Sequence, residues 1–230
     1  MQDSDNSIIN LNLLIRIWIF SVSGLSAFVN MSGFLAYAYS LSHYSGNYIS
    51  IIDGLYHHAF QNATLLLVFC MAFVAGGAIA SFINVNKDFH LESKYGEIQF
   101  AIGIIILFFY LVYFDKDLFI LFLSCALGIQ NGLIRSYRGM GFKTTHVSGT
   151  FTDLGTYIGY FMRGLPDMAW RIRFELSLLF AFGTGTISGL LLFREIHDHV
   201  FIVAGLGYVF SGLFYFLLRY LNRRNRQDSK

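Results

Sequence analysis

The chain has 230 residues, of which 55% are hydrophobic, 18% aromatic and only 13% charged. Soluble domains carry roughly 25% charged residues, so a soluble chain of this length would have too few charges to cover its apolar surface. The formal net charge of +2 is small and does not alter this conclusion. The composition therefore predicts a polytopic membrane protein whose residues 1–230 form a single membrane domain, and it excludes a separate soluble domain.

Six apolar stretches are long enough to cross a bilayer as helices, since a spanning helix needs about 20 mostly apolar residues. They cover residues 15–40, 62–84, 98–114, 117–135, 174–193 and 199–220. The segment MQDSDNSIINLNLL lacks a basic region, and no clear cleavage site follows the first stretch. We interpret that stretch as a retained helix rather than a signal peptide. The predicted fold class is an all-α integral membrane protein.

Two further apolar segments, residues 48–60 and 151–163, are too short to span. Each gives ~13 residues, or ~20 Å of helix, against a hydrocarbon core of about 30 Å. Either both segments cross the bilayer poorly, which gives eight spans, or both enter and return as re-entrant helices, which gives six.

The positions of the basic residues separate these two alternatives, because cytoplasmic flanks collect Lys and Arg. With the N-terminus cytoplasmic and six spans, only Lys116 and Arg194 of the 16 Lys and Arg residues fall outside. Eight spans would move Lys87, Lys94, Arg135, Arg138, Lys143 and Arg194 outside. The sequence therefore favours six spans with both termini cytoplasmic. The basic tail, residues 221–230, is expected to meet anionic headgroups, and it is too short and too poor in aromatic residues to bind nucleic acid.

One polar motif occurs twice, each time between a long apolar stretch and a short one. The first copy reads Ser42-His43-Tyr44-Ser45-Gly46-Asn47, and the second reads Thr145-His146-Val147-Ser148-Gly149-Thr150. Residues 27–30 and 128–131, before the motifs, both end in Asn, and we expect Asn30 and Asn131 to hold helices together rather than to touch a ligand. Residues 77–81 and 185–189, after the motifs, are both rich in small side chains.

This duplication predicts two repeats of one membrane unit, at about residues 14–114 and 116–220. With three spans in each half, the second half enters the membrane from the opposite side. The two motifs then face opposite sides of the bilayer, which is the arrangement of inverted repeats.

The two histidines, His43 and His146, are the first candidate functional residues. Ionisable side chains at membrane depth are costly and usually face a cavity or a partner. One interpretation is that each ring tethers the broken backbone by hydrogen bonding. The other is that the rings bind a ligand or carry protons, since imidazole titrates near physiological pH. A metal site is disfavoured because no second strong ligand lies at helical spacing from either histidine.

The glycine steps Ser45-Gly46-Asn47 and Ser148-Gly149-Thr150 stand at the start of the two short segments. A helix beginning there would present unpaired N–H groups and a positive dipole end, which can hold an anion. The alternative is ordinary helix capping by these side chains. Asp153 lies about one turn further on, where it would bind a cation, carry protons or complement the helix dipole.

At these motifs the chain resembles the YoaK-type family of bacterial integral membrane proteins, a domain of unknown function. The second copy carries the closer resemblance, in Gln130-Asn131-Gly132 and in Thr144-Thr145-His146-Val147-Ser148-Gly149-Thr150-Phe151-Thr152-Asp153-Leu154-Gly155. The first copy departs from the pattern in Tyr44 and in Ser50, which replaces an acid. The resemblance covers about residues 14–220. It implies a six-span protein of the bacterial inner membrane and no particular activity.

The leading functional hypothesis is a small-molecule or ion transporter, not an enzyme, with an anionic or polar ligand and no cofactor or metal. Its predicted substrate-binding residues are the motif residues and one acid: His43, Ser45, Gly46, Asn47, His146, Ser148, Gly149, Thr150 and Asp153. The alternative is a non-transporting membrane scaffold or accessory subunit. An intramembrane enzyme is disfavoured because no paired nucleophile or metal-ligand cluster is visible. Besides the lipid bilayer, a second copy of the chain is a compatible partner, because six short spans enclose little volume.

Overall fold

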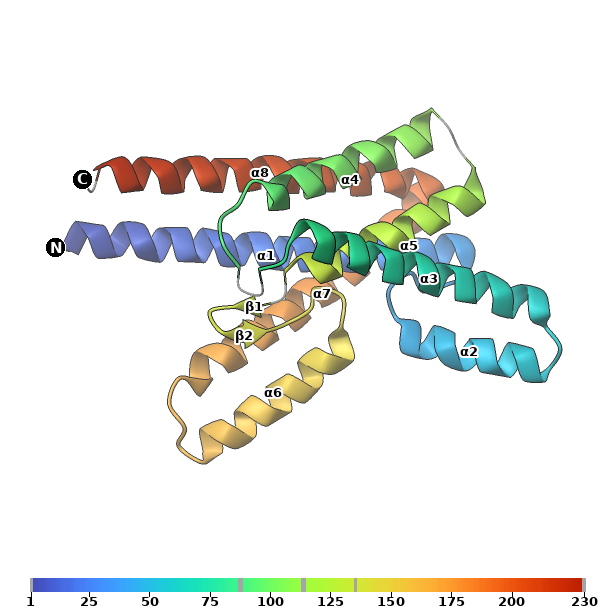
Figure 1. Cartoon of the computed structure of the whole chain (residues 1–230), viewed down its shortest axis with the longest axis horizontal. Coiled ribbons are helices and arrows are strands. Elements are labelled where there is room, and N and C mark those ends of the chain that lie inside the picture. The colour runs from blue at the N-terminus through green and yellow to red at the C-terminus, as the bar shows by residue number, and fades with distance from the viewer. Residues whose placement is uncertain (1, 87–88, 113–114, 135, 229–230) are drawn as a thin grey trace.

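The computed structural model describes residues 2–86, 89–112, 115–134 and 136–228. Over these residues the protein is helical apart from one small hairpin (Figure 1). In chain order the elements are α1 (Gln2–Tyr37), α2 (Tyr44–Tyr56), α3 (Phe60–Ile83), α4 (Lys94–Leu111), α5 (Lys116–Leu133), β1 (Ser136–Tyr137), β2 (Met140–Gly141), α6 (Val147–Met162), α7 (Met168–Ile196), η1 (His197–His199) and α8 (Val200–Asp228).

Among the described residues, five segments are long and apolar enough to cross a membrane. They are Leu11–Tyr37, Phe60–Ile83, Lys94–Leu111, Lys116–Leu133 and Met168–Asn225. The last of them contains both α7 and α8, which the short helix η1 separates. The 13-residue α2 and the 16-residue α6 are not among these segments. The protein is therefore an all-α, multi-pass membrane protein, as the composition predicted.

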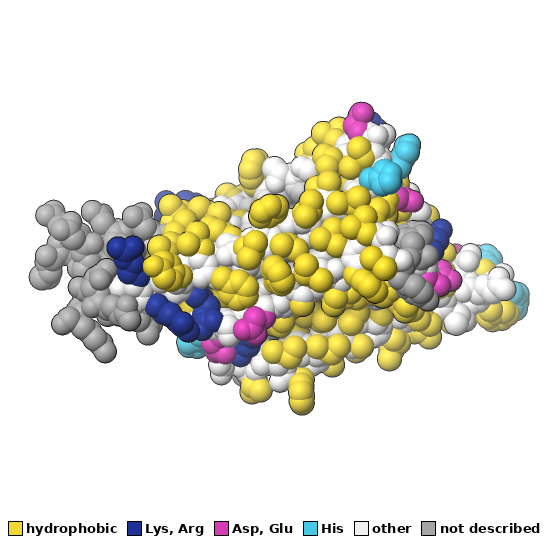
Figure 2. Space-filling view, turned by 90° about the horizontal axis from the view of Figure 1, so that it is seen from above, with side chains coloured by type: hydrophobic (Ala, Val, Ile, Leu, Met, Phe, Trp, Pro, Cys, Tyr) yellow, Lys and Arg dark blue, Asp and Glu magenta, His cyan; other side chains and the backbone are white. Residues whose placement is uncertain are grey.

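The outer surface is apolar to a degree that only a lipid environment accommodates. Phe82, Phe180 and Phe210 are 90%, 74% and 66% exposed. Figure 2 shows hydrophobic side chains over most of the face in view, with most of the Lys and Arg side chains gathered toward the end at the left. Both chain termini lie at that end (Figure 1). An exposed apolar surface of this extent would be costly in water and is favourable in hydrocarbon.

The long helices associate as three close pairs, in which α1 packs along α7, α3 along α5 and α4 along α8. Glycine makes each pair possible. A Cβ atom at Gly185 would overlap the backbone of Gly24 on α1, and one at Gly76 would overlap the backbone of Cys125 on α5. A Cβ at Gly103 would lie 2.6 Å from the carbonyl oxygen of Gly205. Membrane helices gain stability from such backbone contact, because burial away from water provides no drive inside lipid.

A buried aromatic cluster fixes α1 against α4 and α8. Trp18 is fully buried, and its ring centroid lies 4.6 Å from that of Tyr215 and 6.2 Å from that of Tyr95. Its Nε1–H donates to the carbonyl oxygen of Ser211 over 3.2 Å. The indole thus buries its apolar surface and still satisfies its donor. Residue positions on the middle of α1 are consequently fixed relative to the rest of the molecule.

The hairpin between α5 and α6 was not predicted from the sequence. Its two strands pair antiparallel through Ser136 with Gly141 and Tyr137 with Met140. Arg138 and Gly139 form the turn with φ values of 54° and 72°. Two successive residues with positive φ make a type I′ turn, which favours a tight hairpin. Residue 135, which precedes the hairpin, lies outside the described residues.

Candidate functional site

The loop that precedes α2 is held by one asparagine on α1. Asn30 Oδ1 accepts hydrogen bonds from the backbone N–H groups of Leu41 and Ser42, at 2.8 and 3.0 Å. Its Nδ2 lies 3.0 Å from Nδ1 of His43. The asparagine thus satisfies two backbone N–H donors of the loop that follows α1. This bonding brings the chain back along α1, so that α2 begins beside the last two turns of the longer helix and not beyond its end.

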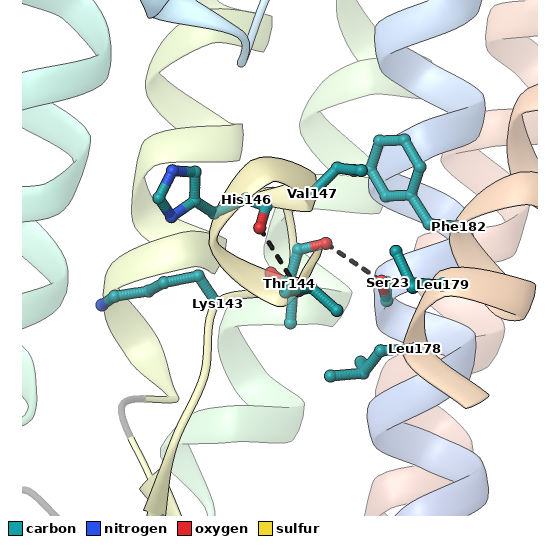
Figure 3. Close-up of a pocket in the computed structure, with 9 residues that line it drawn as sticks. Ser23, Lys143, Thr144, His146, Val147, Leu178, Leu179 and Phe182 are labelled. Atoms are coloured by element: carbon teal, nitrogen blue, oxygen red, sulfur yellow. Dashed lines mark hydrogen bonds between the residues drawn. The ribbon is translucent and has the colours of Figure 1, made fainter. Parts of the chain in front are cut away.

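The loop that precedes α6 has an equivalent support. Asn131 Oδ1 accepts from the backbone N–H of Thr145 at 3.3 Å. The hydroxyls of Ser23 and Ser26 on α1 donate to the carbonyl oxygen of Thr144, at 3.0 and 3.1 Å. Figure 3 shows the first of these two bonds. The second motif is therefore fixed by both α5 and α1, and the two asparagines hold loops rather than helices.

The two short helices begin directly after the motif histidines, which occupy the N-cap positions. Within the described chain, neither His43 nor His146 caps its helix through a side-chain hydrogen bond. Asn47 Nδ2 donates instead to the carbonyl oxygen of Ser40 at 2.7 Å, and Thr150 Oγ1 donates to that of His146 at 3.3 Å. The polar side chains of the motif therefore brace the loops and do not provide N-cap bonds to the N–H groups of the first turn.

The two motifs meet beside α7. The His43 ring packs edge-on against Phe182, with 5.7 Å between ring centroids. His146 and Phe182 line one very small pocket together with Ser23, and the two histidines lie within Coulombic range of each other. Residues about a hundred positions apart in sequence are thus brought to one place in the fold.

A cavity of about 200 Å³ opens at the first turn of α6. Its lining combines residues of the hairpin and loop with residues of the helix: Gly141, Phe142, Lys143, His146, Gly149, Thr150 and Asp153. In Figure 3 the side chains of Lys143 and His146 point to the same side, away from Leu178 and Phe182 on α7. A Cβ at Gly149 would lie 2.6 Å from Nδ1 of His146, so only glycine leaves the imidazole in its place.

The cavity gathers four predicted residues, all from the second motif and its helix: His146, Gly149, Thr150 and Asp153. It does not include the predicted residues of the first motif, His43, Ser45, Gly46 and Asn47, or Ser148 of the second. The side chains of Ser45 and Ser148 are exposed, and a Cβ at Gly46 would meet nothing within 4 Å. The two motifs therefore have similar backbones and different surroundings.

Sequence reasoning missed Glu175. This residue on α7 is fully buried, and neither of its carboxyl oxygens bonds to any described residue. The carboxylate of Asp153 on α6 is near enough to repel a negative charge on Glu175. Arg171, one turn earlier on α7, lies instead over the rings of Tyr157 and Trp170, at 5.5 Å in each case. The signal was available, because an acid inside the apolar stretch 174–193 is unusual in a membrane helix.

These observations define a class of protein: a multi-pass helical membrane protein in which two short helices begin at polar breaks inside the fold. The family described as protein of unknown function (DUF1275) matches residues 19–214, and the chain belongs to this family. The match agrees with the YoaK-type resemblance of the motifs. No curated protein and no solved structure matches the chain.

Proposed function

We propose that this protein is a transporter of a small anionic or polar solute, and that the solute binds where α2 and α6 begin. One observation carries the proposal. The first residues of these two short helices meet beside Phe182, although the helices run toward opposite ends of the molecule (Figure 1). Short helices that start at membrane depth from opposite sides are a recurrent construction of transporter binding sites.

The packing of the long helices supports two inverted repeats, at about residues 14–114 and 116–220. Counting the short helices, each repeat has four helices, α1–α4 and α5–α8. The first helix of each repeat packs parallel to the third helix of the other, α1 along α7 and α5 along α3. The remaining pair, α4 and α8, consists of the last helices of both repeats. Exchanging the two repeats therefore leaves this pairing scheme unchanged, as a two-fold axis in the membrane plane requires.

The same scheme gives six spans, because α7 and α8 reverse direction at η1 while α2 and α6 are too short to cross. With α2 and α6 re-entrant, both termini would lie on one side, and the distribution of basic residues supports a cytoplasmic location for that side. The membrane we propose is the bacterial inner membrane.

The charges around the cavity favour an anionic or polar ligand. The first turn of α6 contributes the positive end of its helix dipole, and Lys143 and His146 add donors on the same side. Asp153 supplies a carboxylate that would carry a proton or select the orientation of the ligand. The volume of about 200 Å³ suits a solute smaller than a drug-sized molecule, since pockets for such molecules begin at about 300 Å³.

A non-transporting scaffold or accessory subunit is the second candidate, and one contact favours it. The Asn30 side chain lies 3.0 Å from Nδ1 of His43, so this histidine has a role in holding the loop without any ligand. Under this alternative, both motifs only maintain the fold, and ligands leave the stability of the protein unchanged.

A ligand screen with matched glycine variants separates the two candidates. We would measure the thermal unfolding of the detergent-purified protein with inorganic anions and short carboxylates, for wild type, Gly149→Leu and Gly155→Leu. Leucine at 149 would displace the His146 ring, whereas a Cβ at 155 on the same helix meets nothing within 4 Å. The transporter proposal expects an anion that stabilises wild type and Gly155→Leu but not Gly149→Leu. Equal responses of the two variants, or no response in wild type, would support the scaffold.

A further inference from the structure

The interface of α1 and α7 carries a surface groove that the proposed transport site does not use. At its end nearest the termini lies a pocket of about 390 Å³, lined by Leu13, Arg16, Phe20, Trp170, Arg173, Phe174 and Ser177. A second pocket, of about 460 Å³, continues from Phe20 along the same two helices as far as Phe28 and Ser188. We call these two parts the basic pocket and the apolar groove.

The dimensions of the groove match one leaflet of a membrane. Because α1 and α7 run parallel, both helices line the groove over its whole length, from Leu13 to Phe28 on α1 and from Trp170 to Ser188 on α7. From Leu13 to Phe28 on α1 it covers ~22 Å at 1.5 Å per residue. Half of a hydrocarbon core of about 30 Å is ~15 Å, so an extended acyl chain fits along the groove below a headgroup in the basic pocket.

The charge of the basic pocket is unbalanced. Among the described residues, neither Arg16 nor Arg173 forms an ion pair with a carboxylate. Two further guanidinium groups lie over the ring of Trp170, those of Arg138 at 5.4 Å and Arg171 at 5.5 Å. Tryptophan is enriched at the level of the lipid headgroups. Basic pockets between helices on the cytoplasmic side of membrane proteins bind the phosphate of lipid headgroups.

Two of the three hydroxyl groups that line the apolar groove already donate within their own helices, and the third is that of Ser188. The exposed hydroxyls of Ser21 and Thr184 donate to carbonyl oxygens of their own helices, at 2.8 and 2.9 Å. Phe20, Leu25 and Phe180 provide most of the remaining lining. A hydrocarbon chain is therefore the better chemical match.

We propose that the groove between α1 and α7 binds an anionic phospholipid, with its phosphate between Arg16 and Arg173 and one acyl chain in the apolar groove. The charge of the basic pocket selects an anionic over a zwitterionic headgroup, and its continuity with the apolar groove selects a lipid over free phosphate. This site is independent of the proposed transport site on the other side of α7.

The test uses the full chain in detergent, with phosphatidylglycerol or phosphatidylcholine of identical acyl chains added. Native mass spectrometry counts the lipids bound, and thermal unfolding measures stabilisation. The variants are Arg16→Gln/Arg173→Gln and, as a matched control at the same end of the molecule, Arg223→Gln/Arg224→Gln on α8. We expect phosphatidylglycerol to bind and stabilise wild type and the control. We expect roughly 10- to 30-fold weaker binding to Arg16→Gln/Arg173→Gln, from the loss of two basic contacts.

A third variant tests the apolar groove separately. Thr184→Phe fills it from an exposed position and leaves both arginines in place, so it should also lose the bound lipid. Equal binding of the two lipids, or unchanged phosphatidylglycerol binding to Arg16→Gln/Arg173→Gln, would overturn the proposal. Inorganic phosphate that stabilises as well as the lipid would reassign the pocket to a free anion. A lipid-free dimer that Thr184→Phe dissociates would reassign the groove to a second copy of the chain.

Discussion

Replacing Asn30 by alanine should destabilise the protein more than any other change to a polar motif side chain. Asn30 Oδ1 accepts from the backbone N–H groups of Leu41 and Ser42, and both of these residues are buried. Alanine removes the acceptor of these two N–H groups. An unsatisfied buried donor costs about 1–3 kcal/mol, so we expect a loss of about 2–4 kcal/mol. The equivalent change Asn131→Ala removes a single, longer bond of 3.3 Å and should cost about 1 kcal/mol.

Equilibrium unfolding in mixed micelles, with increasing denaturing detergent, measures this difference. Asn62→Ala is the control, because Asn62 is exposed at the start of α3. If Asn30→Ala unfolds at the same denaturant concentration as Asn62→Ala, the Asn30 side chain does not hold the loop against the last turns of α1. A loss for Asn131→Ala as large as that for Asn30→Ala would contradict the unequal bonding of the two loops.

Three other changes test the packing and the buried polar groups. Gly185→Leu should prevent the close association of α1 with α7 and leave little folded protein. Gly183→Leu should fold normally, because a Cβ at Gly183 meets nothing within 4 Å, and the yield of monodisperse protein distinguishes the two variants. Glu175→Met should raise the unfolding free energy by about 1–2 kcal/mol, because it removes a buried carboxyl without partners, and a loss of stability would mean that a bonding partner exists. Tyr208→Phe should lower the free energy of unfolding by about 1–2 kcal/mol, because the Tyr208 hydroxyl donates to Gln130 Oε1 in a fully buried position. An unchanged midpoint in the same unfolding assay would contradict this.

The helices were largely predictable because hydrophobic length determines them in a membrane. The stretches 62–84 and 117–135 agree closely with α3 and α5. The stretch 174–193 underestimates α7, which begins at Met168, because its first turns carry Trp170, Arg171 and Arg173. A hydropathy pattern ends where charge begins, whereas a helix continues as long as its backbone bonds are made.

The candidate site was predictable only in part. Sequence placed His146, Gly149, Thr150 and Asp153 near one another, because they lie within two turns at the start of one helix. It did not predict the other wall of the cavity, which Lys143 and its neighbours form. Their position depends on the hairpin and on the bonds from α1 to the loop, and neither leaves a periodic signal in the sequence.

The proposed inverted repeats imply that two copies of one motif have diverged in chemistry while keeping their backbone arrangement. In the motif alignment, Lys143 and Asp153 of the second copy correspond to Ser40 and Ser50 of the first. Ser40 Oγ accepts from the backbone N–H of His43 at 3.0 Å, so the first copy uses this position to bond its own loop. The second copy carries Lys143 there, whose ammonium donates to the carbonyl oxygen of Asn131 at 3.2 Å and whose side chain also lines the cavity.

This difference assigns separate roles to the two halves within the proposed transport site. The first motif, whose histidine bonds to Asn30, is a structural element, and the second motif provides the charges that a ligand would meet. Lys143→Ser should therefore abolish anion stabilisation of the purified protein and preserve its fold. Ser40→Ala should lower stability and preserve the ligand response. The reverse pattern would show that the ligand binds at the first motif, and the assignment of the cavity at α6 would then be wrong.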